Sequence, residues 1–298
     1  MSFTGMGRFR AEELVGQELA GGPLPTAGVR ARRRGRPRVW RVTIFVLAAI
    51  FFVGPLLAAF KFSLLQDNGH YGFANYGQIL SNSAVRSSLT TSLEIAVITA
   101  AIVVILMLPT IVWVRLRQPK LTPVMELVTL LPIVIPPVVM AAGLEVLQED
   151  APQWMIKLVF NHPLTALTPF YAVLAMPFSY RAIDTGIRAI DLRTLVDASR
   201  NLGASWSSTL LRVILPNVQT AVLGAMFLTV ALCLGEVVIA SLLLYNTFPV
   251  EMVALRLQSH VGVSVALSMI TLLFTFLLLF LLSFLAQRRH GAASVRVL

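Results

Sequence analysis

The sequence predicts an all-α membrane protein with six transmembrane helices and both ends of the chain in the cytoplasm. Hydrophobic residues make up 57% of its 298 residues and charged residues only 13%, whereas soluble domains carry about 25% charged residues. The chain contains six apolar stretches that are long enough, at about 20 residues, to cross the hydrocarbon layer as helices. The Lys and Arg residues gather on one side of the arrangement that these stretches define.

The expected spans alternate with polar loops. In chain order they are Val42–Phe60, Leu89–Trp113, Thr122–Leu147, Pro163–Ile183, Asn217–Tyr245 and Val261–Leu285. The first is longer than the apolar region of about 7 to 15 residues in a secretory signal, so we expect it to be retained. Residues 1–38 are rich in Gly, Pro and Arg and lack helical periodicity, which predicts a disordered basic cytoplasmic tail. Residues 39–287 would form the transmembrane domain and 288–298 a second cytoplasmic tail.

The basic residues set the expected orientation. With both ends inside, 20 of the 24 Lys and Arg residues face the cytoplasm, and only Lys61, Arg86, Lys157 and Arg256 lie outside. This topology also explains the net charge of +10, because basic residues near span ends orient helices and meet the anionic inner leaflet. We therefore expect contact with a lipid bilayer and no binding of nucleic acid.

The loop between the fourth and fifth spans predicts a helix–turn–helix on the inner membrane surface. Asp191 can cap the first helix, Gly203 suits the left-handed residue that ends it, and Ser205 or Ser207 can start the second. Pro216 is expected to interrupt the second helix before the next span. The apolar positions follow helical spacing and are Leu192, Leu195, Val196, Ser199 and Leu202, then Leu210, Leu211 and Ile214. An amphipathic connector without a partner would have the same pattern.

A motif in this loop favours a coupling function. Asp197-Ala198-Ser199 is followed by Gly203 and, after nine intervening residues, by Val213, Leu215 and Pro216. The spacing resembles that of the cytoplasmic loop of binding-protein-dependent ABC importer permeases. Their pattern opens with Glu-Ala-Ala, and Asp197 and Ser199 keep its charge sign and compact size.

The resemblance extends from about Trp40 to Leu285. It implies a type I ABC importer permease fold in the inner or plasma membrane of a bacterial cell, with a cytoplasmic coupling helix within residues 184–216. It also implies ABC ATPase subunits, a second permease that is identical or homologous, and an extracytoplasmic substrate-binding protein. By the same resemblance, Asp197 would lie near basic groups of the ATPase, Ala198 and Ser199 would permit close packing, and Gly203 would make the turn.

The chain itself is not expected to be an enzyme. It lacks the pattern Gly, four residues, Gly-Lys-Ser/Thr that cradles phosphate, so ATP would be bound by the partner subunit, with no cofactor here. Cys233 is the only cysteine and the four histidines lie in loops or tails, so no metal site or catalytic residue is expected. A membrane scaffold or a membrane-embedded enzyme stays the alternative of another class.

Several acidic residues lie in or near the expected spans, where charge is costly. Glu94 follows Thr91 at capping-box spacing, and Glu126 falls in the first turn after Thr122-Pro123, so both are interpreted as helix caps. Glu236, beside Gly235 in the fifth span, either makes a helix–helix hydrogen bond or lines the translocation path.

Prolines in the third span predict that this span lines the translocation path together with the fifth. Pro132, Pro136 and Pro137 must bend or break its helix, and irregular backbone at membrane depth needs protein or a water-filled cavity. We therefore assign Pro136 and Pro137 to the path, together with Gly235 and Glu236. At its outer end the acidic rim, Glu145, Glu149 and Asp150, is either a solvated loop edge or a site that attracts cations or docks the binding protein.

The cargo is the least constrained property. Tyr180-Arg181-Ala182-Ile183-Asp184 and Arg188-Ala189-Ile190-Asp191 resemble the spermidine/putrescine-type branch of the family. Iron, thiamine, sulfate and phosphonate permeases share much of this loop, so those solutes stay open. The acidic rim and Glu236 favour a cation, and a polyamine is the expected substrate.

Overall fold

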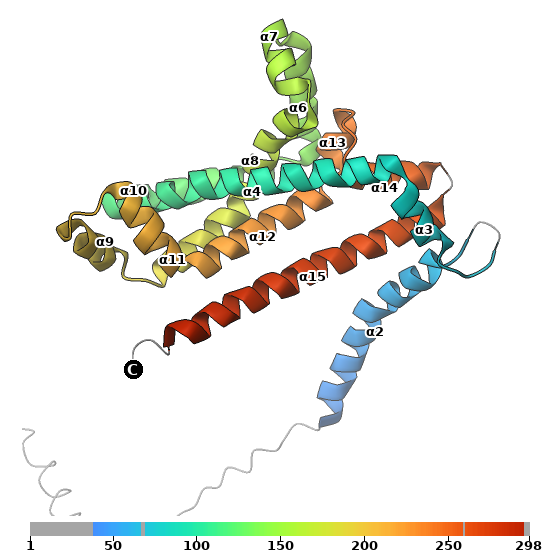
Figure 1. Ribbon diagram of the computed structural model, residues 1–298, viewed down its shortest axis with the longest axis horizontal. Coiled ribbons are helices and arrows are strands. Elements are labelled where there is room, and N and C mark those ends of the chain that lie inside the picture. The colour runs from blue at the N-terminus through green and yellow to red at the C-terminus, as the bar shows by residue number, and fades with distance from the viewer. Residues whose placement is uncertain (1–37, 67–68, 259, 295–298) are drawn as a thin grey trace, which may run out of the picture. The chain divides into compact units, whose positions relative to one another are not determined.

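The computed structural model describes residues 38–66, 69–258 and 260–294, and within these ranges the chain folds almost entirely into helices (Figure 1). The long helices are α2 (Arg38–Ser63), α4 (Ser83–Arg117), α5 (Thr122–Val134), α6 (Pro137–Asp150), α8 (Pro163–Arg188), α12 (Gln219–Gly235) and α15 (Val261–Ser294). The shorter ones are α3 (Ala74–Ser81), η1 (Pro119–Leu121), α7 (Gln153–Met155), η2 (Ile156–Phe160), α9 (Leu192–Asn201), α10 (Trp206–Ser208), η3 (Thr209–Ile214), α11 (Leu215–Asn217), α13 (Val238–Leu242) and α14 (Phe248–Leu257). The tail expected at residues 1–38 lies outside the described residues up to position 37.

The chain divides into two units, Met1–Val53 and Gly54–Leu298. The described part of the first unit is the N-terminal portion of α2, an apolar helix from Trp40 onward. The second unit contains every other helix of the described residues.

The structure gives three to five candidate membrane spans among the described residues, compared with the six expected. Trp40–Ser63, Ser83–Arg117 and Gln219–Leu242 each pass as single spans. Two further spans are helix pairs bent at a break: Pro119–Val134 with Pro137–Asp150 at 87°, and Gln153–Phe160 with Pro163–Arg188 at 78°. In the sixth stretch, Val261–Leu277 forms a shorter apolar part of α15. Six spans and the orientation of the termini stay predictions.

The expected break in the third span is confirmed. Helix α5 ends at Val134, Ile135 is extended with φ −85° and ψ 118°, and α6 begins at Pro137. The residue before a proline is driven out of the helical region, and a proline at the first helical position loses no hydrogen bond. Pro132, in contrast, lies within α5, so the break falls at Ile135 and Pro136 only.

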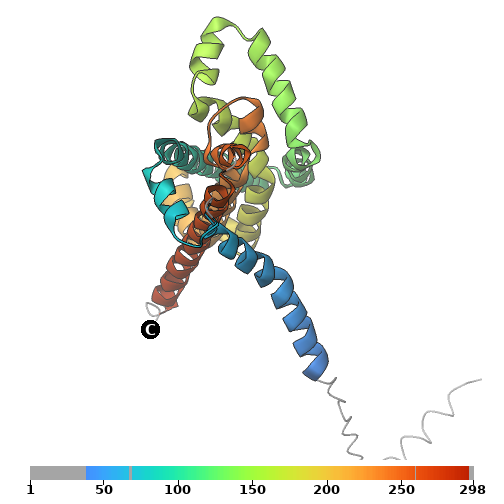
Figure 2. The same ribbon diagram turned by 90° about the vertical axis from the view of Figure 1, so that its right-hand side faces the viewer.

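Helices α4, α8 and α12 form the core of the second unit, and α6 and α7 stand out from it (Figures 1 and 2). Helix α8 lies very close to α12 because Gly186 has no side chain: a Cβ there would come within 2.3 Å of the Cβ of Ala221. The buried hydroxyls of Ser179 and Thr229 also join these helices at 2.9 Å. This packing holds the C-terminal end of α8, from which the helix–turn–helix follows.

Candidate functional site

The predicted helix–turn–helix is present as α9, a turn, and a second arm made of α10, η3 and α11; we call it the hairpin. Asp191 caps α9 as expected: one carboxylate oxygen accepts from the backbone N–H of Thr194 at 3.3 Å and the other from its hydroxyl at 2.7 Å. The hydroxyl contact and then the backbone contact lower the pKa of Asp191 below its usual value. The cap therefore stays charged at neutral pH.

The turn depends on Gly203, as the sequence predicts. Gly203 has φ +81°, a conformation in which a side chain would be strained. Its N–H donates to the carbonyl of Arg200 at 2.9 Å, and the N–H of Ala204 donates to the carbonyl of Ser199 at 3.1 Å. The guanidinium of Arg200 donates a hydrogen bond to the carbonyl of Ala204 at 2.8 Å. Backbone and side-chain hydrogen bonds therefore both stabilise the turn.

The second arm starts at Ser205, whose hydroxyl accepts from the backbone N–H of Ser208 at 3.3 Å. The expected interruption at Pro216 is wrong, because Pro216 lies within helix α11 and the chain leaves helical geometry at Val218, with φ −109°. The preceding segment η3 is a π-helix. In such a wider turn the hydrogen-bond register shifts, which accommodates a residue without an N–H.

The two arms are joined by a buried hydroxyl pair. The hydroxyls of Ser199 and Thr209 are 2.9 Å apart, and Thr209 has no exposed surface. Ser199 thus lies on the inner face of α9 with Leu192 and Val196, while Asp197 and Ala198 are exposed. Of the second half of the motif, Val213 and Leu215 are half-buried and Pro216 is exposed.

The tip of the hairpin carries an exposed leucine that the sequence pattern placed on the buried face. Leu202 is the C-cap residue that follows α9, with φ −81° and ψ 7°, and 88% of its surface is exposed. Helical spacing failed here because the helix ends one residue earlier, at Asn201, and the turn redirects the side chain. Asp197, Ala198, Leu202 and Gly203 therefore form an exposed set of one acid, two small residues and one apolar residue.

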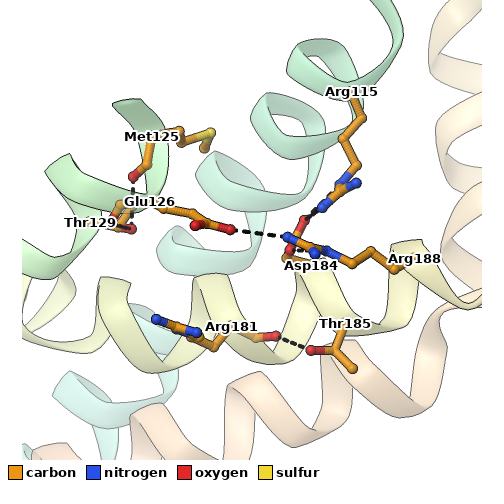
Figure 3. A network of polar contacts seen from close by, with 8 residues as sticks. All are labelled: Arg115, Met125, Glu126, Thr129, Arg181, Asp184, Thr185 and Arg188. Carbon is orange, nitrogen blue, oxygen red and sulfur yellow. Dashed lines mark hydrogen bonds and ion pairs between the residues drawn. The ribbon is translucent and has the colours of Figure 1, made fainter. Parts of the chain in front are cut away.

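An ionic network that the sequence pattern did not reveal lies where α8 ends, just before the hairpin (Figure 3). The carboxylate of Asp184 accepts from Nε of Arg115 at 2.6 Å and from Nε of Arg188 at 2.8 Å. Arg188 also pairs with Glu126 at 3.0 Å. The network connects the C-terminal end of α4, the start of α5 and the C-terminal end of α8.

Charge burial explains the network. The side chain of Asp184 is only 7% exposed, against 23% for Arg115 and 54% for Arg188, and a buried carboxylate requires paired positive charge. The interpretation of Glu126 as a helix cap is wrong: no side chain caps α5, and Glu126 binds Arg188. The spacing of Asp184 and Arg188, four residues apart, was the available signal.

Glu236 also differs from expectation. Helix α12 ends at Gly235, Glu236 is extended with φ −81° and ψ 114°, and its carboxylate accepts from the backbone N–H of Ile239 at 3.0 Å. Glu236 thus makes its hydrogen bond within the local backbone, where it caps α13, and the helix of the fifth expected span is interrupted at Glu236 and Val237. Gly235 is exposed and Glu236 half-buried.

The helices that follow the irregular segments of the third and fifth expected spans pack against each other. Helix α6, which begins at Pro137, packs against α13, which begins just after Glu236 and Val237; Ala141 and Ala240 lie in their shared core. Pro136 is exposed and Pro137 half-buried. The helices next to the two irregular segments are therefore neighbours, and the assignment of both segments to one path stays a prediction.

The acidic rim lies at the far end of α6, and all three of its carboxylates are exposed. Glu145 and Glu149 line a groove of about 350 Å³ against Leu242–Leu244, while Asp150 is not among its lining residues.

The capping role expected for Glu94 is wrong, because α4 begins earlier: Asn82 caps it by accepting from the N–H of Ala84 at 2.9 Å. Glu94 is an exposed residue inside that helix.

Comparisons with known proteins give one similar sequence, one similar structure and one matching family. The probable molybdenum ABC transporter permease protein of Haloferax volcanii is 27% identical over 234 residues, which cover 76% of this chain and 83% of the relative. A crystal structure of an amino acid ABC transporter with histidines aligns with 74% of this chain and 99% of its own, at 16% identity and a TM-score of 0.47. The family described as "Binding-protein-dependent transport system inner membrane component" matches residues 96–291. The chain therefore belongs to this family and is a multi-pass permease subunit of an ABC importer.

Proposed function

We propose that the hairpin is the contact through which separate ATPase subunits drive this permease. The observation that carries the proposal is the exposed set Asp197, Ala198, Leu202 and Gly203, on a hairpin whose arms and turn are joined by hydrogen bonds. Small residues allow a partner to approach closely, and a carboxylate offers a directional charge-assisted hydrogen bond. Burial of the exposed leucine by a partner would stabilise the complex, because apolar surface leaves water. Membership of an importer family supports a cytoplasmic motor on another chain.

Contacts within the hairpin and at the end of α8 would transmit a movement of the hairpin to the core. The hydroxyl pair Ser199–Thr209 keeps the two arms together, and Asp184 ties α8 to α4 only seven positions before the cap at Asp191. A displacement of the hairpin would therefore move α8 and α4 together rather than bend the connection. The other expected partners are a second permease and an extracytoplasmic binding protein.

The test uses the permease reconstituted with its ATPase and binding protein. Asp197→Arg reverses the exposed charge without entering the buried face, so it should abolish most ATP-dependent uptake while the permease stays folded in the membrane. Asp197→Glu keeps the carboxylate and should retain uptake. Equal uptake by the Arg variant and the parent would remove the case for coupling through this surface.

For the cargo we propose a small solute, with a polyamine as the first candidate. The motif around Tyr180–Asp191 and the groove with Glu145 and Glu149 support a cation. A second candidate, an oxyanion such as molybdate, is favoured by one observation, the name of the Haloferax volcanii relative. Glu236 does not discriminate between them, because its carboxylate is already used to cap α13.

Competition for uptake separates the two cargoes. Proteoliposomes with the complete importer are given radiolabelled spermidine or molybdate, each with the other as competitor. If the cargo is a polyamine, spermidine accumulates, and Glu145→Gln with Glu149→Gln lowers the rate. Accumulation of molybdate alone, insensitive to both variants, would overturn the polyamine candidate and leave the role of the hairpin intact.

A further inference from the structure

A polar groove of about 530 Å³ lies between the C-terminal end of α4 and the hairpin. It is a different surface from the hairpin tip, although Asp197 borders both. Its lining residues are Leu116 and Arg117 of α4, Arg193, Val196, Asp197 and Arg200 of α9, and Trp206 of α10.

The groove has an excess of positive charge. Three guanidinium groups line it, from Arg117, Arg193 and Arg200, against the single carboxylate of Asp197. Within the described part of the chain, no hydrogen bond or ion pair involves the side chain of Arg117 or Arg193, and the side chain of Arg200 donates one N–H to the backbone of Ala204. This differs from the ionic network nearby, in which carboxylates balance the arginines. The groove thus presents several unused N–H donors in the fork geometry that suits phosphate.

The charge pattern of α4 indicates where the groove lies relative to the membrane. Residues 95–114 carry no Asp, Glu, Lys or Arg, and Glu94 and Arg115 flank them. At ~1.5 Å per residue this segment is ~30 Å long, the thickness of the hydrocarbon layer. Arg117 then lies at the level of the lipid headgroups, and Trp113 and Trp206, 49% and 39% exposed, suit the same interfacial zone.

We propose that this groove binds a phosphate group, that of an anionic phospholipid headgroup or of a free phosphate compound at the inner membrane surface. Arg117 and Arg193 hold the phosphate oxygens from two different helices, and Arg200 adds positive charge. The groove joins α4 to α9, so an occupant would bridge the core and the hairpin. This inference does not rest on the proposed function, because binding is measured on the permease alone.

The experiment measures the thermal unfolding midpoint of the whole chain in neutral detergent during titration with water-soluble dihexanoyl lipids. Dihexanoyl phosphatidylglycerol should raise the midpoint in a saturable way, and the phosphatidylcholine analogue should not. Inorganic pyrophosphate is the second arm: saturation by pyrophosphate but not by phosphatidylglycerol supports the site and identifies a free phosphate compound as its occupant. Equal responses to both lipids without response to pyrophosphate would overturn the proposal.

Variants locate the effect. Arg117→Gln with Arg193→Gln should weaken the apparent affinity at least tenfold, and Arg117→Lys with Arg193→Lys should recover part of it. Arg212→Gln removes an exposed charge from the hairpin outside the groove and should leave the affinity unchanged. Asp197→Asn should act in the opposite direction and tighten binding.

Two outcomes would refute the groove as the site. One is an unchanged affinity in the Gln double variant when its elution profile on size exclusion and its helical content match those of the parent. The other is that the double variant loses only co-purification with the ATPase, which would assign the groove to an acidic segment of that subunit.

Discussion

Asp184 provides the sharpest test of how the end of the core next to the hairpin is held together. Replacing it by Asn keeps the volume but removes the negative charge that Arg115 and Arg188 share. We predict that Asp184→Asn is the most destabilising single change in the ionic network, and that Glu126→Gln, at its rim, has a much smaller effect.

The magnitude follows from exposure. Removing one partner of a fully buried ion pair costs ~3–5 kcal/mol, because the other charge is left without compensation. Here Arg115 is 23% and Arg188 54% exposed, so water relieves part of that cost and we expect ~2–3 kcal/mol. Glu126 is 39% exposed and meets the more exposed arginine, which gives the ~0.2–1 kcal/mol of a surface pair.

The assay is thermal unfolding of the purified permease in detergent, followed by helical circular dichroism. With ~2–4 °C per kcal/mol for a chain of this size, Asp184→Asn should lower the midpoint by ~4–12 °C and Glu126→Gln by no more than ~4 °C. Asp150→Asn, an exposed acid outside the network, is the control and should stay within about 0.5 kcal/mol of the parent.

A double-mutant cycle completes the test. Because Arg115 and Asp184 act as one pair, Arg115→Gln combined with Asp184→Asn should cost less than the sum of the single changes. The reasoning would be refuted by additive effects, or by a Glu126→Gln variant that loses as much stability as Asp184→Asn.

Three further predictions concern the hairpin and the core. Gly203→Ala should cost about 1 kcal/mol, because φ is +81° and a Cβ is disfavoured there; Gly203→Asn should cost less, and equal thermal midpoints for both variants and the parent would contradict this. Ser199→Ala leaves the buried hydroxyl of Thr209 without its 2.9 Å partner and should cost ~1–2 kcal/mol, with part of the loss recovered on adding Thr209→Val; an additive double variant in the same unfolding assay would count against the pair. Gly186→Ala places a Cβ 2.3 Å from that of Ala221 and should lower the midpoint, whereas Gly186→Ala with Ala221→Gly should restore it; no rescue would show that the helices separate instead.

Local chemistry explains why parts of the hairpin were predictable from sequence. The Asp191 cap, the turn at Gly203 and the start at Ser205 each depend on one residue and its immediate neighbours, so composition and spacing were enough. The break between α5 and α6 was predictable for the same reason, since Pro136 and Pro137 restrict the backbone directly.

The misassigned acids have a different cause. Glu126 and Glu94 were interpreted by their distance from the nearest expected helix start. For Glu94 that start was displaced, whereas α5 begins at Thr122 as expected and Glu126 is instead taken up by a distant arginine. Helix α4 begins at Ser83, before its apolar stretch, and Arg188 reaches Glu126 from 62 positions along the chain. Glu236 was placed inside a continuous helix because its neighbours are apolar, and apolar sequence does not distinguish a helix from a short break.

The sequence alone determined the membrane class, the likeness to an importer permease and the local design of the hairpin, because hydrophobic content, spacing and caps act over a few residues. Only the tertiary structure decided that Asp184 is a buried charge held by two arginines, that α6 packs against α13, and that three arginines surround one groove beside the hairpin. Those features arise between helices far apart in the chain, and the free energy of pairing or burying a charge depends on which side chains packing brings within reach.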